Sequence, residues 1–136
     1  MIIEQAVGDA PDRPVLVVED NHLNQIVAEG MLRLLGYSCR CVSDGLQALA
    51  VLQSDEHPIV LMDVHMPLLD GYEATRRIRA ELPAERQPYI IALSASVLPE
   101  DARLCRDAGM DDFVPKPISK ISLRAALDRA GTPTTD

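Results

Sequence analysis

The feature that most constrains how this chain can fold is a regular alternation of short apolar runs with amphipathic segments. The clearest apolar runs cover residues 15–18, 59–62 and 89–93, and weaker ones cover residues 37–42 and 112–114. Continuous apolar runs of this length are typical of strands that are buried on both faces. The sequence therefore predicts five short strands, each separated from the next by a longer segment.

An amphipathic segment with helical periodicity follows each predicted strand. In the first segment, apolar residues recur at helical spacing and predict one buried face; they are Leu23, Ile26, Val27, Gly30, Met31, Leu34 and Leu35. Gly36 is expected to end this helix. The remaining helices are predicted to begin at Ser43-Asp44-Gly45, to span residues 72–82 after an Asp70-Gly71 turn, to begin at Pro99-Glu100-Asp101, and to cover residues 123–130.

A strand and a helix repeated five times predict an α/β domain, in which a parallel sheet lies between two helical layers. Right-handed crossovers leave few arrangements, of which we favour the flavodoxin-like strand order 2-1-3-4-5. The 136 residues fit one domain, predicted over residues 14–130, with a polar leader or linker at 1–13 and a tail at 131–136. A hydrophobic fraction of 47% supports a packed core and excludes a disordered chain.

Charge and cysteine content exclude several classes of protein. The 13 basic side chains against 21 acidic ones give a net charge of −8, so neither a nucleic-acid partner nor an anionic membrane surface is expected. No apolar stretch approaches the ~20 residues that span a bilayer, and no secretion signal opens the chain, which favours the cytoplasm. Cys39, Cys41 and Cys105 form no Cys-x-x-Cys motif and are expected to be small buried side chains in a reducing compartment. His22 and His57 are expected at the surface.

Polar side chains stand at the carboxyl ends of four predicted strands. These residues are Glu19 and Asp20 after the first strand, Asp63 after the third, Ser94 after the fourth and Lys116 after the fifth. Because these four strands are neighbours in the predicted order, their ends converge on one pocket. Clustered carboxylates repel one another unless a cation joins them, and a set of oxygen ligands suits Mg²⁺.

The converging groups match what phosphoryl transfer to an aspartate requires. A divalent cation would screen an incoming phosphoryl group from the acids, Lys116 would neutralise one phosphate oxygen, and the Ser94 hydroxyl would donate a hydrogen bond to another. In-line attack by an aspartate would then form an acyl phosphate. Any one of these residues alone could be a helix cap or a loop residue. Their joint occurrence at neighbouring strand ends argues for a site.

Motifs of other nucleotide-binding and catalytic proteins are missing. The sequence contains no Gly-x-Gly, no Gly-Lys-Ser or Gly-Lys-Thr, and no Gly-x-Ser-x-Gly. The alternative function is an Mg²⁺-dependent phosphatase or transferase that works through an aspartyl phosphate. Such phosphatases resemble Asp-x-Asp at the nucleophile, whereas this chain has Asp63-Val64-His65. A partner-binding domain that has lost its chemistry is a third possibility, against which the complete pocket argues.

Four strings, in order, resemble the receiver domains of two-component response regulators over residues 14–130. They are Val-Val-Glu-Asp-Asn at 17–21, Leu-Met-Asp-Val-His-Met-Pro-Leu-Leu-Asp-Gly at 61–71, Ile-Ile-Ala-Leu-Ser-Ala at 90–95 and Gly-Met-Asp-Asp-Phe-Val-Pro-Lys-Pro at 109–117. A further run, Glu-Asp-Asn-x-x-Asn-Gln at 19–25, is similar to receivers attached to hybrid sensor kinases.

The resemblance implies a phospho-acceptor module of a phosphorelay, with no independent enzymatic activity beyond promoting its own phosphorylation and dephosphorylation. Asp63 would accept the phosphoryl group from a histidine kinase or a histidine phosphotransfer protein. Asp20, Asp63 and the backbone carbonyl of His65 would hold Mg²⁺ directly, and Glu19 would act through water. His65 itself replaces residues that are often smaller or amide-bearing in relatives.

The resemblance also implies a conformational switch. Lys116 matches the lysine of the family, and its bond to Pro117 matches the family's cis peptide. The Ser94 hydroxyl would move toward the phosphate, and Phe113 would fill the space emptied behind the fourth strand; the alternative is that Phe113 is a fixed core ring. A partner could then read the face formed by the fourth helix, the fifth strand and the fifth helix.

Overall fold

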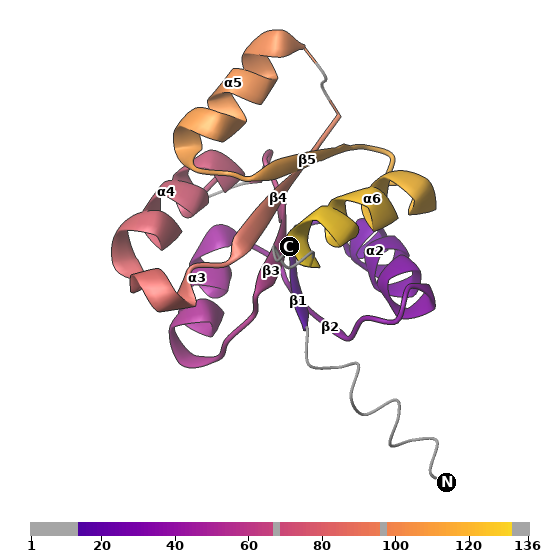
Figure 1. The fold of residues 1–136 in the computed structure, drawn as a ribbon, viewed down its shortest axis with the longest axis horizontal. Coiled ribbons are helices and arrows are strands. Elements are labelled where there is room, and N and C mark those ends of the chain that lie inside the picture. Colours follow the sequence, from indigo (N-terminus) through magenta and orange to yellow (C-terminus); the bar gives the residue numbers. More distant parts are fainter. Residues whose placement is uncertain (1–13, 67–68, 96–97, 132–136) are drawn as a thin grey trace, which may run out of the picture.

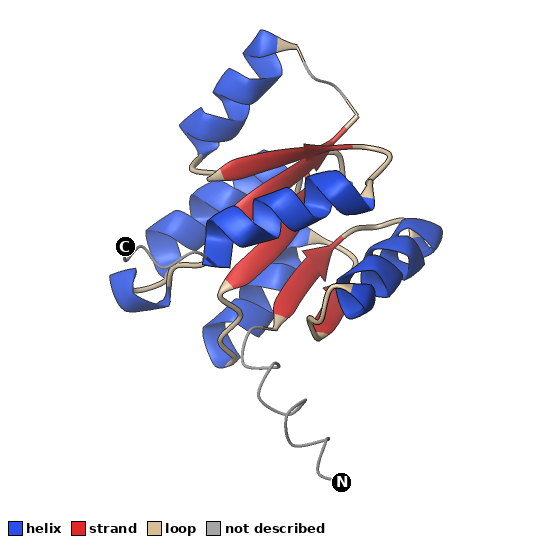
Figure 2. Ribbon diagram, turned by 45° about the vertical axis from the view of Figure 1, so that its right-hand side comes forward, coloured by secondary structure: helices blue, strands red, loops and turns tan. Residues whose placement is uncertain are grey.

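Five parallel strands form the centre of the molecule, between two layers of helices (Figure 1, Figure 2). This computed structural model describes residues 14–66, 69–95 and 98–131. The strands are β1 (Val15–Val18), β2 (Cys39–Val42), β3 (Ile59–Asp63), β4 (Tyr89–Ser94) and β5 (Asp112–Pro115). They pair in the order β2-β1-β3-β4-β5, each parallel to its neighbours, which confirms the predicted flavodoxin-like topology.

Helices cover both faces of the sheet. They are α2 (His22–Leu34), α3 (Gly45–Ser54), α4 (Gly71–Glu81), α5 (Pro99–Ala108) and α6 (Lys120–Gly131), and a short 3-10 helix, η2 (Ala84–Arg86), precedes β4. The helices α2 and α6 lie on one face of the sheet, and α3, α4 and α5 lie on the other (Figure 2). No helix within the described residues is long and apolar enough to cross a membrane.

Successive side chains of each strand enter two separate cores, which explains why the strands are apolar throughout. In β1, Leu16 and Val18 pack on the side of α3 and α4, whereas Val15 and Val17 pack on the side of α2 and α6. All four side chains are fully buried. Since neither face of such a strand meets water, the alternation of apolar and polar residues that marks a half-exposed strand disappears.

Side chains in the turns after the strands begin three of the helices. Side-chain oxygens of Asn21, Asp44 and Asp70 accept hydrogen bonds from the backbone N–H three residues later, at 3.0, 2.8 and 2.9 Å. Such caps satisfy donors that the first turn of a helix leaves unpaired. Because each cap follows the carboxyl end of a strand, the three caps also fix the turns along that edge of the sheet.

The face that α2 turns to the sheet differs from the prediction. Ala28 and Leu32 are buried, with Met31 and Leu35 partly buried beside them. Four side chains that were predicted inward are instead exposed by 67%, 50%, 41% and 73%: Leu23, Ile26, Val27 and Leu34. Apolar residues form two overlapping stripes on this helix, and the stripe with the small Ala28 packs against β1 and β2. Periodicity alone does not choose between such stripes.

The predicted exposure of three further side chains is also wrong. Cys39 and Cys41 are half-exposed, because β2 is an edge strand with a neighbour on one side; Cys105 is buried as predicted. His57 is 8% exposed and so does not lie at the surface. Its burial lowers the pKa of the imidazole, which favours the neutral form.

Candidate functional site

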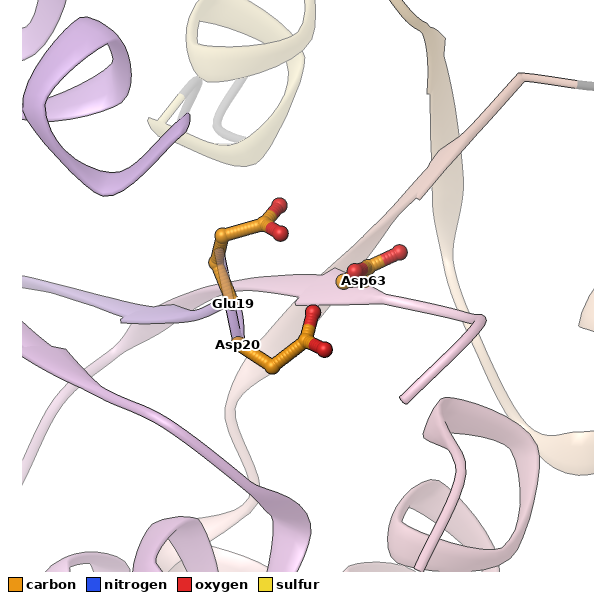
Figure 3. Close-up of side chains that lie close together, drawn as sticks. All are labelled: Glu19, Asp20 and Asp63. Carbon is orange, nitrogen blue, oxygen red and sulfur yellow. The ribbon is translucent and has the colours of Figure 1, made fainter. Parts of the chain in front are cut away.

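Three carboxylates meet at the carboxyl edge of the sheet. Glu19 and Asp20 follow β1, and Asp63 ends β3, the strand beside β1. One oxygen from each carboxylate lies within 4.8 Å of the other two, and Figure 3 shows the three side chains around one common space. Glu19 and Asp63 are 1% and 2% exposed, whereas Asp20 is exposed. The cluster is therefore anchored in the protein on one side and open to solvent on the other.

Lys116, just after β5, brings a positive charge to this cluster. Its Nζ lies 3.2 Å from Glu19 Oε1 and 3.2 Å from Asp63 Oδ1. Burial by itself would lower the pKa of Lys116, but the carboxylates of Asp63 and Glu19 outweigh burial and raise this pKa above 10.5. The ammonium is thus charged at any ordinary pH. The peptide bond from Lys116 to Pro117 is cis.

Two further residues join the ends of β3, β4 and β5 around Asp63. Ser94 ends β4, next to β3, and is 1% exposed. Its backbone oxygen accepts a hydrogen bond of 2.9 Å from the Lys116 N–H. The backbone N–H of His65 donates to Asp63 Oδ1 at 3.2 Å, while the His65 side chain is exposed. The expected contact of the His65 carbonyl with a metal stays a prediction.

The donor set fits a hard divalent cation. Glu19 Oε2 accepts hydrogen bonds from the Asn21 N–H at 3.2 Å and from Asn24 Nδ2 at 3.4 Å. Glu19 Oε1 is buried and faces Lys116 Nζ, but it receives no well-angled hydrogen bond from the described part of the chain. A buried carboxylate oxygen that lacks such a hydrogen bond is stabilised by a nearby cation. Mg²⁺ takes oxygen ligands and keeps several waters, which the exposed side of Asp20 allows.

Phe113 lies on β5, where it is paired with Ala92 of β4. Its half-buried ring packs against the core on the side of α4 and α5. The ring also lines a cavity of about 180 Å³ together with Ala102 and Cys105 of α5. Open space therefore adjoins the ring, which is neither sealed in the core nor fully exposed. The coupled movement of Ser94 and Phe113 stays a prediction.

Three residues have contacts at this edge that sequence reasoning did not assign. The amide of Asn24 touches the Glu19 carboxylate, and Gln25 Nε2 donates to the Glu19 backbone oxygen at 2.6 Å. The Gly71 N–H donates to the Val64 oxygen at 3.2 Å, and a Cβ added to Gly71 would lie 2.7 Å from Val64 Cα. The signal for the first two was the Glu-Asp-Asn-x-x-Asn-Gln run. The Asp-Gly pair that ends the 61–71 string predicts a turn, but it does not predict the close contact of Gly71 with Val64.

Comparison with known proteins identifies relatives of the chain. The response regulator receiver domain model matches residues 15–128. The sensor histidine kinase RcsC of Escherichia coli is 39% identical over 127 residues, which cover 91% of this chain and 13% of that protein. Histidine kinase 5 of Arabidopsis thaliana is 33% identical over 152 residues, which cover 93% of this chain and 16% of that protein. The chain thus spans a small part of the length of these relatives.

Solved receiver domains share the fold. One, from a sensor histidine kinase of Pseudomonas aeruginosa PAO1 with a magnesium ion coordinated in its active site cleft, has a TM-score of 0.77 and 44% identity, with coverage of 86% of this chain and 95% of that one. The receiver domain of Ssk1 from Saccharomyces cerevisiae, crystallised with the histidine phosphotransfer protein Ypd1, has a TM-score of 0.81 and 28% identity, with coverage of 89% and 90%. Together with the matching family model and the strand order, these likenesses show that the chain belongs to the response regulator receiver domains of two-component phosphorelays.

Proposed function

We propose that Asp63 accepts a phosphoryl group from a phosphohistidine, with Mg²⁺ held beside it by Asp20 and, through water, by Glu19. The observation that carries the proposal is the buried carboxylate of Asp63, 2% exposed, with Lys116 Nζ at 3.2 Å and two further carboxylates alongside. A carboxylate must be ionised to attack phosphorus, and the charged lysine favours that form. The buried acid Asp63, the solvent-exposed side of the proposed metal site and the fixed charge of Lys116 together suit the formation of an aspartyl phosphate.

In the proposed reaction, a carboxylate oxygen of Asp63 attacks phosphorus. The phosphorus–nitrogen bond of the donor breaks, and its electron pair returns to the imidazole. Mg²⁺, when bound, supplies positive charge to the phosphate oxygens. Lys116 supplies a second charge, and the Ser94 hydroxyl donates a hydrogen bond to one phosphate oxygen. The His65 N–H, which donates to Asp63 Oδ1 at 3.2 Å, holds the carboxylate in one orientation before attack.

The donor is proposed to dock on the exposed apolar side of α2. Leu23, Ile26 and Val27 are exposed there by 67%, 50% and 41%. Val27 also lines a cavity of about 130 Å³ with Lys116 and Ile118, so this side adjoins the charged site. Exposed apolar surface of this kind favours a protein partner. A helix that carries the donor histidine could cover it and still present its imidazole to the acids.

The phosphorylated state is proposed to be read on the face of α5, β5 and α6. Phe113 lines the cavity on that face, and Leu104, which is 49% exposed, lies on α5, the same helix as Cys105 of the cavity lining.

We place the chain in the cytoplasm, where the half-exposed thiols of Cys39 and Cys41 would stay reduced.

The test of the proposed function is phosphotransfer from a purified, phosphorylated histidine phosphotransfer protein, with and without Mg²⁺. We expect the phosphoryl group to be transferred to the wild type in the presence of Mg²⁺ and not to Asp63→Asn. Ile26→Asp, which charges the proposed docking side, should slow transfer from the protein donor and leave labelling by acetyl phosphate unchanged. Transfer to Asp63→Asn at the wild-type rate would contradict the proposal.

The same protein distinguishes the alternative function. A phosphatase or transferase should turn over many molecules of p-nitrophenyl phosphate. The proposed receiver should instead take up one phosphoryl group per chain and release it slowly. Sustained multiple turnover would favour the enzyme.

A further inference from the structure

Amide-bearing residues of the run at 19–25 converge on Glu19. We propose that Asn24 and Gln25 are positioning residues, which hold the carboxylate and the main chain of Glu19 toward the cation and thereby set the affinity of the site for Mg²⁺. The inference rests on the proposed function, because it takes the carboxylate cluster to be the metal site. Neither residue belongs to the cluster of three carboxylates itself.

Asn24 acts on the side chain of Glu19. Its Nδ2 donates to Glu19 Oε2 at 3.4 Å, a long hydrogen bond, and the Asn21 N–H donates to the same oxygen at 3.2 Å. Both donors therefore engage one oxygen, and Glu19 Oε1 is left facing Lys116 Nζ at 3.2 Å. A glutamate side chain has several rotatable bonds, so a carboxylate that is fixed at one oxygen loses less freedom when the other oxygen accepts a hydrogen bond from a water on the cation.

Gln25 acts on the main chain of Glu19. Its Nε2 donates to the Glu19 backbone oxygen at 2.6 Å and approaches the Val42 oxygen at 3.4 Å. The Glu19 N–H in turn donates to the Val42 oxygen at 3.1 Å. Gln25 thus continues the connection between the ends of β1 and β2 past the last paired residues. The chain that carries Glu19 and Asp20 is held at the point where it leaves the sheet.

A role in helix capping alone does not account for these contacts. The cap of α2 is the Asn21 side chain, whose Oδ1 accepts from the Asn24 N–H at 3.0 Å, so the cap needs no side chain at position 24. The Asn24 side chain is half-buried and lines the same cavity as Lys116 and Val27. It therefore adjoins the charged site and not the apolar core.

Titration calorimetry with MgCl₂ tests the proposal on the wild type, Asn24→Ala and Gln25→Met. The methionine in Gln25→Met keeps the length of the glutamine side chain and removes its hydrogen-bond donor. Gln47→Ala is the matched control, because Gln47 Oε1 accepts a hydrogen bond of 2.9 Å from the Ser43 N–H at another strand-to-helix turn, outside the cluster. We expect Asn24→Ala and Gln25→Met each to bind Mg²⁺ about tenfold more weakly, as for residues that orient a ligand. Gln47→Ala should bind as the wild type does. Thermal unfolding without metal reports whether each variant folds, and either variant alone carries the test.

Each outcome decides a different claim. Wild-type Mg²⁺ affinity in both folded variants would overturn the positioning role and leave the proposed function intact. Equal weakening in Gln47→Ala would also overturn it, because the effect would then be general to these turns. A wild type that binds no Mg²⁺ would overturn both the positioning role and the metal part of the proposed function.

Discussion

Gly71 allows a quantitative prediction, because α4 begins against the main chain that follows β3. A methyl group added at Gly71 would lie 2.7 Å from Val64 Cα, whereas carbon atoms in contact are ~3.5–4.0 Å apart. Either the start of α4 or the main chain at the end of β3 must therefore shift by about 1 Å. Both are backbone segments, so no flexible side chain can move aside to make the space. We expect Gly71→Ala to lower the free energy of unfolding by ~1–3 kcal/mol, the usual cost of overpacking. Since Val64 directly follows Asp63, the same shift should weaken Mg²⁺ binding.

Gly30→Ala is the matched control for this substitution. Gly30 lies within α2, and no atom lies within 4 Å of a methyl group added there. Alanine favours a helix over glycine by ~0.5–1 kcal/mol, so Gly30→Ala should be more stable than the wild type. Urea denaturation followed by circular dichroism measures both variants. If Gly71→Ala is as stable as the wild type, the close approach of α4 to β3 is wrong; if Gly30→Ala is destabilised equally, the loss at Gly71 cannot be assigned to packing.

Three further predictions concern the charged site and the switch. Mg²⁺ at one hundred times its Kd should stabilise the wild type by ~2.7 kcal/mol, and Asp20→Ala should lose most of that gain; an unchanged melting temperature of the wild type would rule out the metal site. Lys116→Met should stay folded near neutral pH but be less stable than the wild type, because it leaves the carboxylates of Glu19 and Asp63, whose side chains are 2% and 3% exposed, without their cation. The carboxylates raise the pKa of Lys116 above 10.5, so the stabilisation from its ion pairs is present below pH 10.5 and is lost as pH rises through the folded-state pKa. The difference in unfolding free energy between wild type and Lys116→Met should shrink over that range in urea denaturation, and a difference that grows would contradict the ion-pair assignment. Beryllofluoride, a phosphoryl mimic, should shift amide NMR signals from Asp63 to the face of α5, β5 and α6 in the wild type but only near the site in Ser94→Ala; equal spreading in both would refute the coupling to Phe113.

The strand order and the convergence of the acids could be predicted because both depend on local patterns. A strand buried on both faces is apolar along its length, as β1 is throughout and β3 is up to its last residue, Asp63. Once the order is known, the ends of neighbouring parallel strands must meet at one edge, which brings Asp20 and Asp63 together without any knowledge of loop conformation.

The rest depends on three-dimensional contacts that a local sequence pattern does not reveal. The buried stripe of α2 was mispredicted because helical spacing does not show that the sheet accepts Ala28 and leaves Ile26 exposed. Position 71 has no room for a side chain, because the main chain of Val64, just after β3, lies against it. The roles of Asn24 and Gln25 require the turn after β1 to bend them back over Glu19, and a run of amide residues does not by itself show that bend.

Reduction of the phosphorylated protein by borohydride, followed by peptide mass spectrometry, tests the central claim most directly. An acyl phosphate on an aspartate is reduced to homoserine, whereas an unmodified carboxylate is not, so the product marks the residue that carried the phosphoryl group. After incubation with acetyl phosphate and Mg²⁺, we predict homoserine at position 63 in the wild type and none in Asp63→Asn. Homoserine at position 20, the longer alcohol that a glutamyl phosphate would give at position 19, or an unchanged total yield of reduced residue in Asp63→Asn would contradict the assignment of Asp63 as the phosphoryl acceptor.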